Sequence, residues 1–383
     1  MSFEAKLEQW SEDRIRKMIE ASTPASVERA LATEERCAVD LAALLCPHAE
    51  RYLESLAQEG QRLTRWHFGR TIGLYAPVYL SNVCGADCLY CGFATQSGYD
   101  QKRLTLDLES VRAECAALAD RGFKSVLFVT GDAPAAVDIE YLVRAVTIGR
   151  EYFPSVCVEV YAMDSPDYER LCQAGLEGVT LYMETFDRDR YAEVHQKGRK
   201  RDFVYRLDAL ERAGNAGARR LSMGVLLGLS DWRVDVFRLA LHARHLQREC
   251  WQSAISISFP RLRHVPDRFR VPNPVSDLEL VQLMLALRLF LPEAGFNLST
   301  RESAHLRDHL IPLGITSMSA GSSTRPGGYA TFGKETLEQF AIDDERSPEE
   351  VAEAIRRVGY DPVWKDFDLA FDDPSAQSNY RME

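Results

Sequence analysis

From about residue 72 the chain alternates short apolar segments with longer amphipathic ones. The short segments are rich in β-branched and aliphatic residues, as strands buried in a parallel sheet are. There are eight of them, at 72–80, 125–130, 156–160, 178–183, 221–227, 254–259, 296–300 and 315–319. Apolar residues at helical spacing fall between most of them, at 108–121, 139–152, 165–174, 188–195, 203–213, 234–245 and 278–290. This alternation indicates an α/β fold, and eight repeats over roughly 250 residues predict a (β/α)8 TIM-type barrel.

The two ends of the chain have a different pattern. Residues 1–70 are predicted to form an N-terminal helical extension that packs onto the barrel, which we expect to occupy residues 71–330. Residues 331–383 are expected to form a C-terminal helical segment and tail. Within this segment Ser347 and Glu350 fit a capping box at the start of a helix.

Composition and charge exclude some classes of function. Apolar residues make up 46% and charged residues 27% of the 383 positions, as in ordinary globular proteins. The net charge of -11 gives no electrostatic support for a nucleic-acid partner. We interpret the basic cluster of Lys197, Arg199, Lys200 and Arg201 as a solvated helix entrance. No segment has the ~18–20 apolar residues that a membrane helix needs, and the start lacks the apolar core of a signal peptide, so we expect a cytoplasmic protein.

Three of the nine cysteines, Cys84, Cys88 and Cys91, crowd into eight residues directly after the first predicted strand. In a barrel of this kind the C-terminal ends of the strands carry the chemistry. Iron–sulfur clusters are normally held by four cysteines, so three would leave one iron open to a substrate or cosubstrate. A structural zinc site needs four closed ligands, and the nearest histidine, His67, lies upstream. Zinc and three unrelated buried thiols remain as alternatives.

The spacing Cys-x3-Cys-x2-Cys, with the aromatic Tyr90 just before the third cysteine, resembles the signature of the radical S-adenosylmethionine (SAM) superfamily. The resemblance implies a 4Fe-4S cluster on Cys84, Cys88 and Cys91, with SAM bound at the open iron. It also implies that an electron from the cluster cleaves SAM to methionine and a 5'-deoxyadenosyl radical. The protein then positions and shields this chemistry.

The resemblance extends over nearly the whole chain to the 2-iminoacetate synthases, the radical SAM tyrosine lyases of thiamine biosynthesis. The most discriminating runs are Ser-Phe-Pro-Arg-Leu-Arg at 258–263 and Leu-Ser-Thr-Arg-Glu-Ser at 298–303. Other matching stretches are 74–93, 130–132, 182–186, 197–198 with Phe203, 224–229, 231–234, 251–252, 326–329 and 363–367. The family reaction breaks the Cα–Cβ bond of L-tyrosine and yields 2-iminoacetate and p-cresol. The resemblance also implies a thiazole synthase as protein partner and a flavodoxin- or ferredoxin-type electron donor.

Other functions stay open beside this one. A tryptophan lyase of antibiotic biosynthesis shares the architecture. The tyrosine lyase of hydrogenase maturation carries a second cluster in a C-terminal domain, and this chain has no cysteine after Cys250, which argues against that function. A cluster protein that only senses redox state would need no substrate residues.

Five residues are assigned to the cofactors by resemblance. They are Tyr90 in the cysteine loop, Gly131 and Asp132 after the second strand, Glu184 after the fourth strand and Arg206 on the next helix. Arginine suits a SAM carboxylate because it donates two parallel hydrogen bonds. A surface position is the alternative for the last two.

The chain departs from the family at two of these places. It has Gly131-Asp132 where the family usually has Gly-Glu, and Met183-Glu184-Thr185-Phe186 where the family usually has Gln-Glu-Thr-Tyr. Aspartate still offers a carboxylate, whereas Met183 and Phe186 keep bulk and lose polar groups. The departures leave SAM binding largely intact and bear on the identity of the amino-acid substrate.

Three further residues are assigned to the substrate. Arg301 ends the seventh predicted strand and resembles the arginine with which aromatic amino-acid lyases clamp the substrate carboxylate. The alternative is an ion pair with Glu302 or Asp308. Tyr79, on the first strand, is expected to contact the substrate or to pack in the core, and Ser319, after the eighth strand, to reach the substrate amino group.

Overall fold

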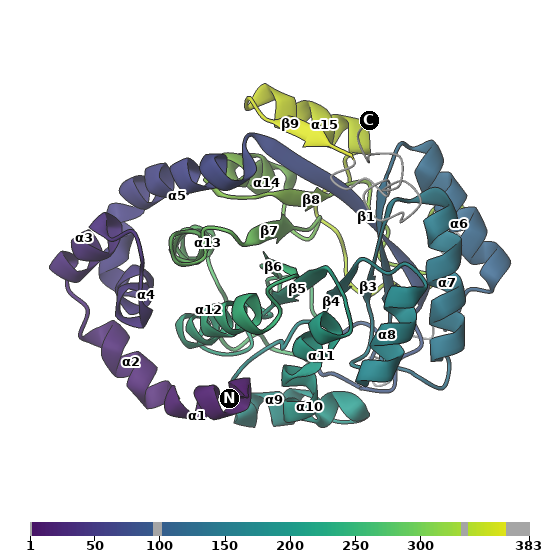
Figure 1. Ribbon diagram of the computed structural model, residues 1–383, viewed down its shortest axis with the longest axis horizontal. Helices are drawn as coiled ribbons and strands as arrows, with labels where there is room; N and C mark the ends of the chain where they lie inside the picture. Colours follow the sequence, from purple (N-terminus) through teal and green to yellow (C-terminus); the bar gives the residue numbers. More distant parts are fainter. Residues whose placement is uncertain (1, 95–101, 331–335, 365–383) are drawn as a thin grey trace, which may run out of the picture.

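The computed structural model describes residues 2–94, 102–330 and 336–364. Its centre is a barrel of parallel strands, which confirms the predicted (β/α)8 architecture (Figure 1). The barrel strands are β1 (Thr71–Ser81), β2 (Ser125–Thr130), β3 (Ser155–Glu159), β4 (Gly178–Thr180), β5 (Arg220–Gly224), β6 (Ala254–Ser258), β7 (Gly295–Leu298) and β8 (Ser317–Ser319). They pair in sequence order, and β1 pairs with both β8 and β2, so the sheet closes.

Helices connect the strands on the outside of the barrel. They are α6 (Leu108–Asp120), α7 (Ile139–Tyr152), α8 (Ser165–Gln173), α9 (Arg188–Val194), α10 (Phe203–Leu207), α11 (Ala209–Asn215), α12 (Trp232–Glu249), α13 (Asp277–Phe290) and α14 (Ala304–Leu310). In most of these helices the side chain of the N-cap residue accepts a hydrogen bond from a backbone amide of the first turn, which stabilises the start of the helix. The prediction of a single helix over 203–213 is wrong. It breaks at Asp208, whose short polar side chain is a poor helix-interior residue, into α10 and α11.

The first seventy residues form an arc of helices along one side of the barrel, drawn in purple in Figure 1. The arc consists of α1 (Phe3–Gln9), α2 (Glu12–Glu20), α3 (Pro24–Ala32), α4 (Ala38–Leu45), a 3-10 turn (Pro47–Tyr52) and α5 (Leu53–Phe68). Helices α4 and α5 pack on α13, and α1 and α2 pack on α12. Helix α13 is therefore covered on both sides, which explains why it is apolar all round instead of amphipathic.

The C-terminal part adds an element that the sequence did not predict. Helix α15 (Pro348–Arg357) begins with the expected capping box of Ser347 and Glu350. It leads into the short strand β9 (Asp361–Val363), which pairs in parallel with the first residues of β1. β1 is eleven residues long and pairs with β2 only from Ala76 onward, so its first residues are left free for β9.

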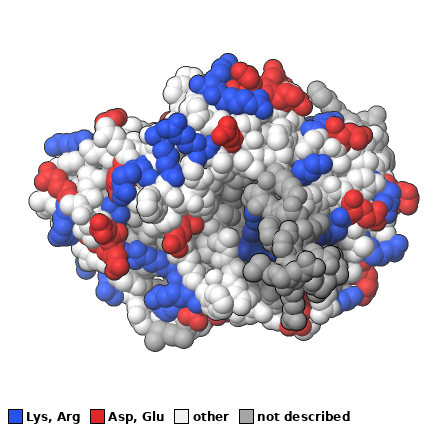
Figure 2. Space-filling model, turned by 45° about the horizontal axis from the view of Figure 1, so that its top comes forward, with Lys and Arg blue, Asp and Glu red and all other residues white. Residues whose placement is uncertain are grey.

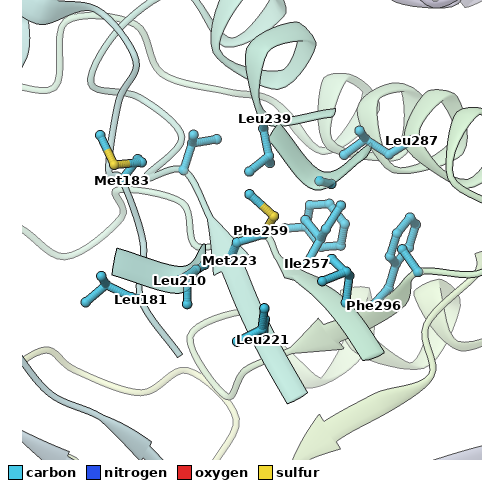
Figure 3. Packing of buried hydrophobic residues seen from close by; sticks show 14 of the residues in the cluster. Leu181, Met183, Leu210, Leu221, Met223, Leu239, Ile257, Phe259, Leu287 and Phe296 are labelled. Atoms are coloured by element: carbon cyan, nitrogen blue, oxygen red, sulfur yellow. The ribbon is translucent and has the colours of Figure 1, made fainter. Parts of the chain in front are cut away.

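The outer face of the barrel wall is buried against the surrounding helices. Figure 3 shows Leu221 and Met223 of β5 and Ile257 of β6 packed with Leu239 and Leu287 from the outer helices. All five are at most 2% exposed. In β5 and β6 these outward apolar residues alternate with Ser222, Ser256 and Ser258, which line a cavity inside the barrel.

The described residues contain no helix that is long and apolar enough to cross a membrane. Figure 2 shows acidic and basic side chains interspersed over one face of the molecule. The described part of this face therefore presents no continuous basic track of the kind that binds a phosphate backbone.

The docking of the arc on α13 can be tested with one substitution. Leu285 on α13 is fully buried, and its side chain lies close against Gly60 of α5. Leu285→Ala should lower the free energy of unfolding by about 2–5 kcal/mol, because it removes buried methyl groups and leaves a cavity. Leu278→Ala on the same helix, where the side chain is 47% exposed, should change it by less than about 0.5 kcal/mol. Chemical denaturation measures both, and equal losses would contradict this packing.

Candidate functional site

A cavity of about 190 Å³ lies at the C-terminal ends of the barrel strands. Every site residue that the sequence predicted lines this cavity. They are Tyr79, Cys84, Cys88, Tyr90, Cys91, Gly131, Asp132, Glu184, Arg206, Arg301 and Ser319. They come from β1, β2, β4, β7, β8 and the segments that follow these strands, so the closed barrel brings together residues far apart in the sequence.

The three cysteines lie on a loop that backbone contacts hold in place. The amide of Gly85 donates to the carbonyl of Asp132 at 2.8 Å, and the amide of Leu89 donates to the carbonyl of Val194 at 3.1 Å. A side chain at Gly131 would have no room, because its Cβ would lie 2.3 Å from the carbonyl oxygen of Val83. The loop is thus fixed against the end of β2 on one side and the end of α9 on the other.

The thiols of the loop are buried close to one another. Burial raises the pKa of Cys88 to about 11, with Lys200 opposing the shift and Cys84 adding to it. Burial, together with the two other cysteines, raises the pKa of Cys91 to about 12. A positively charged metal centre would lower these pKa values again, because cysteine binds a metal as the thiolate and metal binding releases the thiol proton. Backbone amides already point at two sulfurs, from Asp132 to Cys84 at 3.3 Å and from Phe93 to Cys91 at 3.4 Å.

The spacing of the sulfurs distinguishes a cluster from a single ion. Among the described residues, no three His, Cys, Asp or Glu side chains approach closely enough to hold one metal ion. Zinc needs its ligands at about 2.0–2.3 Å around one point. A cubane cluster binds each thiolate at a different iron, so the three sulfurs need not meet. Three thiolates on one loop are therefore suited to hold a 4Fe-4S cluster at three of its irons.

Tyr90 is held by a buried histidine. His195 is fully buried, and its Nδ1 contacts the carbonyl of Tyr191 at 2.9 Å, so Nδ1 must carry the proton. Its Nε2 then accepts the hydroxyl of Tyr90 at 2.8 Å. Burial lowers the pKa of His195 far below its usual range, which keeps the ring neutral. His195 caps a carbonyl, as a histidine at a helix end commonly does, and in addition fixes the cysteine loop.

Glu184 stands in an unusual backbone conformation after β4, with φ of +68°. Its carboxylate accepts a hydrogen bond from the ammonium of Lys200 at 2.6 Å, and a nitrogen of Arg206 lies 3.6 Å away. Arg206 also donates from Nε to the carbonyl of Tyr182 at 2.7 Å. Glu184 and Arg206 are both buried, so neither is the surface residue that was the alternative.

The interpretation of Lys200 as a solvated residue is wrong. Its side chain is 12% exposed and lines the cavity. Burial alone would lower the pKa of Lys200, but the adjacent Glu184 carboxylate outweighs it and the pKa is raised. Because Lys200 is surrounded in the sequence by other basic residues, the sequence did not distinguish this buried cation from its neighbours.

The loop after Glu184 is anchored by Asp235 on α12. Its carboxylate accepts hydrogen bonds from the amide of Phe186 at 2.8 Å and the hydroxyl of Thr185 at 3.1 Å. Phe186 and Met183, two of the departures from the family pattern, are buried and lie outside the cavity lining. They therefore act through packing and do not contact a molecule in the cavity.

Arg301 is buried with its guanidinium 3.6 Å from the centre of the Phe340 ring. Its Nε has no hydrogen-bond partner in the part of the chain that the structure describes. The two acids of the ion-pair alternative are engaged elsewhere. Glu302 pairs with Arg261 and Arg263, and Asp308 pairs with Arg346. The charge of Arg301 is thus directed into the cavity.

The other two residues assigned to the substrate lie on β8 and β1, the two strands that come after β7 around the barrel. The hydroxyl of Tyr79 donates to the side-chain carbonyl of Gln339 at 2.5 Å, and its ring meets Phe93 of the cysteine loop edge-on. The hydroxyl of Ser319 accepts the amide of Thr300 at 3.1 Å. Both hydroxyls therefore have protein partners, and both residues still line the cavity.

One acidic residue in the cavity escaped the sequence analysis. Glu159 is the last residue of β3 and lines the same space as Arg301. Burial, together with the negative charge of Glu184, raises the pKa of its carboxyl to about 7. A signal was present, because the apolar run 156–160 contains one acid, and it lies at the strand end that faces the active site of a barrel.

Comparison with known proteins agrees with this geometry. A sequence model of the radical SAM superfamily matches residues 78–240, and one of the biotin and thiamin synthesis associated domain matches residues 258–361. The chain is 45% identical over 368 residues to the 2-iminoacetate synthase of Escherichia coli (strain K12), covering 96% of this chain and 97% of that protein. Identity is also 45% over 357 residues to the 2-iminoacetate synthase of Salmonella typhimurium, covering 93% of this chain and 94% of that protein.

A solved structure has the same fold. The crystal structure of HydG, a maturase of the FeFe-hydrogenase, superposes with a TM-score of 0.86 at 30% identity. The match covers 93% of this chain and 81% of that chain. Together with the cysteine loop, the barrel and the near full-length identity, these matches place the chain in the 2-iminoacetate synthase family of the radical SAM superfamily.

Proposed function

We propose that this enzyme cleaves the Cα–Cβ bond of L-tyrosine to give 2-iminoacetate and p-cresol, the reaction that supplies the imine for thiamine thiazole. The observation that carries the proposal is the guanidinium of Arg301, which has no hydrogen-bond partner among the described residues and shares one cavity with the cysteine loop. A carboxylate is the natural partner for such a group, because arginine binds it through two parallel hydrogen bonds.

The enzyme uses a 4Fe-4S cluster and SAM, as the superfamily does. When bound, they supply a 5'-deoxyadenosyl radical that removes a hydrogen atom from the substrate. We assign the cluster to Cys84, Cys88 and Cys91. Three thiolates leave one iron free for the amino and carboxylate groups of SAM. Tyr90 holds the loop in shape through its hydrogen bond to His195.

The polar residues on the other wall suit the groups of SAM. Arg206 and Lys200 offer positive charge to its carboxylate, and Glu184 offers an acceptor to its ammonium or ribose hydroxyls. Gly131 and Asp132 bring backbone close to the cysteine loop, where the methionine end would lie. All of these groups are prearranged by mutual contacts, so binding requires little reorganisation.

A second substrate, L-tryptophan, shares the aromatic amino-acid chemistry. The carboxylate clamp would serve both, and the phenol and the indole differ at the other end of the molecule. Because Met183 and Phe186 do not line the cavity, these departures give no direct support to tryptophan.

Two partners belong to this proposal. A flavodoxin- or ferredoxin-type protein would deliver the electron, and a thiazole synthase would take up the reactive imine before water hydrolyses it. A cluster with one iron unprotected by thiolate is suited to the reducing cytoplasm, which we propose as its location.

The first prediction concerns the products. The anaerobically reconstituted enzyme, given SAM and a strong reductant, should form p-cresol and 5'-deoxyadenosine when L-tyrosine is present. Chromatography of the products measures both. If products appear only with L-tryptophan, then tryptophan and not tyrosine is the substrate. An enzyme whose intact cluster never cleaves SAM would contradict the enzymatic function.

The second prediction concerns Arg301. Arg301→Ala should abolish tyrosine-dependent formation of p-cresol, because it removes the carboxylate clamp. The iron content should stay that of the wild type, since Arg301 makes no contact with the cysteine loop that the structure records. Unchanged turnover would rule out the clamp.

The third prediction concerns the cysteine loop. Gly131→Ala should prevent cluster assembly, because the added Cβ would lie 2.3 Å from the carbonyl oxygen of Val83 and 2.7 Å from the Cβ of Cys84. Iron analysis and visible absorbance after reconstitution measure the loss. Gly73→Ala at the other end of β1, where the nearest atom would be 3.7 Å away, serves as the control and should load iron normally. Full loading of both variants would show that the loop tolerates displacement.

A further inference from the structure

The cavity contains a second charged residue without a partner. Glu159 is the last residue of β3 and is paired with Val129 of the neighbouring strand β2. On its other side, β3 neighbours β4, which leads to Glu184. Along β3, Val156 and Val158 are buried in the wall, whereas Cys157 and Glu159 line the inner cavities. Strand periodicity thus directs Glu159 into the barrel.

The cations that face Glu159 are Lys200, Arg206 and Arg301. Lys200 and Arg206 are turned to Glu184, which accepts from Lys200 at 2.6 Å. Among the described residues, Glu159 makes no hydrogen bond or ion pair, and the Nε of Arg301 is also unsatisfied. In the described part of the chain, one carboxyl group and one guanidinium of this cavity therefore have no protein partner, although an unpaired charge withdrawn from water is costly.

A ligand that carries both charges would satisfy both residues at once. We propose that Glu159 binds the α-ammonium group of the substrate while Arg301 binds its α-carboxylate, so that this pair selects an α-amino acid. The inference rests on the proposed function, since it takes the substrate to be an amino acid held by Arg301.

The position of Glu159 favours the ammonium over the phenol of tyrosine. The two charged groups of an α-amino acid are attached to one carbon, so the residues that bind them must be neighbours. Glu159 and Arg301 interact electrostatically across the cavity, and each shifts the pKa of the other. The phenol lies at the far end of the substrate, away from this pair.

The ionisation of Glu159 agrees with this role. Its pKa of about 7 applies to the cavity without substrate, where burial and Glu184 disfavour the charged form. A bound ammonium would lower the pKa again, because an opposite charge favours the carboxylate. A proton and the substrate ammonium would then compete, and the affinity for tyrosine should fall as the pH decreases through 7.

The test uses three ligands that share the phenol ring. L-tyrosine has both charged groups, tyramine has only the ammonium, and 3-(4-hydroxyphenyl)propionate has only the carboxylate. Their dissociation constants are measured by equilibrium dialysis under anaerobic conditions, with the reconstituted enzyme and SAM. The variants are Glu159→Gln, Glu159→Asp and Arg301→Gln, with Glu140→Gln on the exposed face of α7 as the control.

Glu159→Gln should weaken binding of L-tyrosine and tyramine by about tenfold to a hundredfold, because a charge-assisted hydrogen bond is lost. It should leave the binding of 3-(4-hydroxyphenyl)propionate unchanged, and Glu159→Asp should restore part of the affinity for the ammonium ligands. Arg301→Gln should show the reverse selectivity, with tyramine unaffected. Glu140→Gln should bind all three ligands as the wild type does.

Two outcomes would overturn the inference alone. Equal weakening of all three ligands by Glu159→Gln would assign the residue to the phenol or to folding, and no weakening would remove it from the site. In either case the wild type would still form p-cresol from tyrosine. A wild type that neither binds tyrosine nor forms p-cresol would instead overturn the proposed function, and this inference with it.

Discussion

The site depends on the pairing of β1 with both β8 and β2. The cysteine loop follows β1, the residues that we assign to SAM follow β2 and β4, and Arg301 follows β7. In an open sheet the first and last of these strands would lie at opposite edges. Closure brings the two ends of the sheet together, so one cavity holds groups that are more than two hundred residues apart in the chain.

Charge balance is the second constraint, because the cavity buries several ionisable groups. Lys200 and Arg206 both pair with Glu184, so the charges in this cluster already have protein partners, with one positive charge in excess. Glu159 and Arg301 form the incomplete part, since neither charge has a protein partner among the described residues. A protein usually avoids isolated buried charges, and the places where it keeps them indicate a ligand of opposite charge.

The sequence predicted the barrel and the cysteine centre because both depend on local patterns. Strands such as β2 are continuous apolar runs, and the three cysteines lie close together in the chain. Lys200 was misinterpreted because burial depends on tertiary contacts, and four basic residues within five positions resemble a solvated surface. β9 was missed because three residues that include Pro362 have no strand pattern of their own, and only the free part of β1 makes them a strand.

The N-terminal arc contributes to the site from outside the barrel. Phe186, next to the Glu184 segment, meets His242 of α12 edge-on, and Phe3 of α1 stacks on the same histidine at 4.3 Å between ring centres. Asp235 of α12 holds the amide of Phe186 from the adjoining turn. The strained conformation of Glu184 is thus supported by a packed layer that includes the arc, since a residue with positive φ persists only where its surroundings fix it. Phe186, which stands where the family usually has tyrosine, belongs to this supporting layer. Such a layer tolerates the exchange of one bulky side chain for another more readily than the cavity wall tolerates a change of charge.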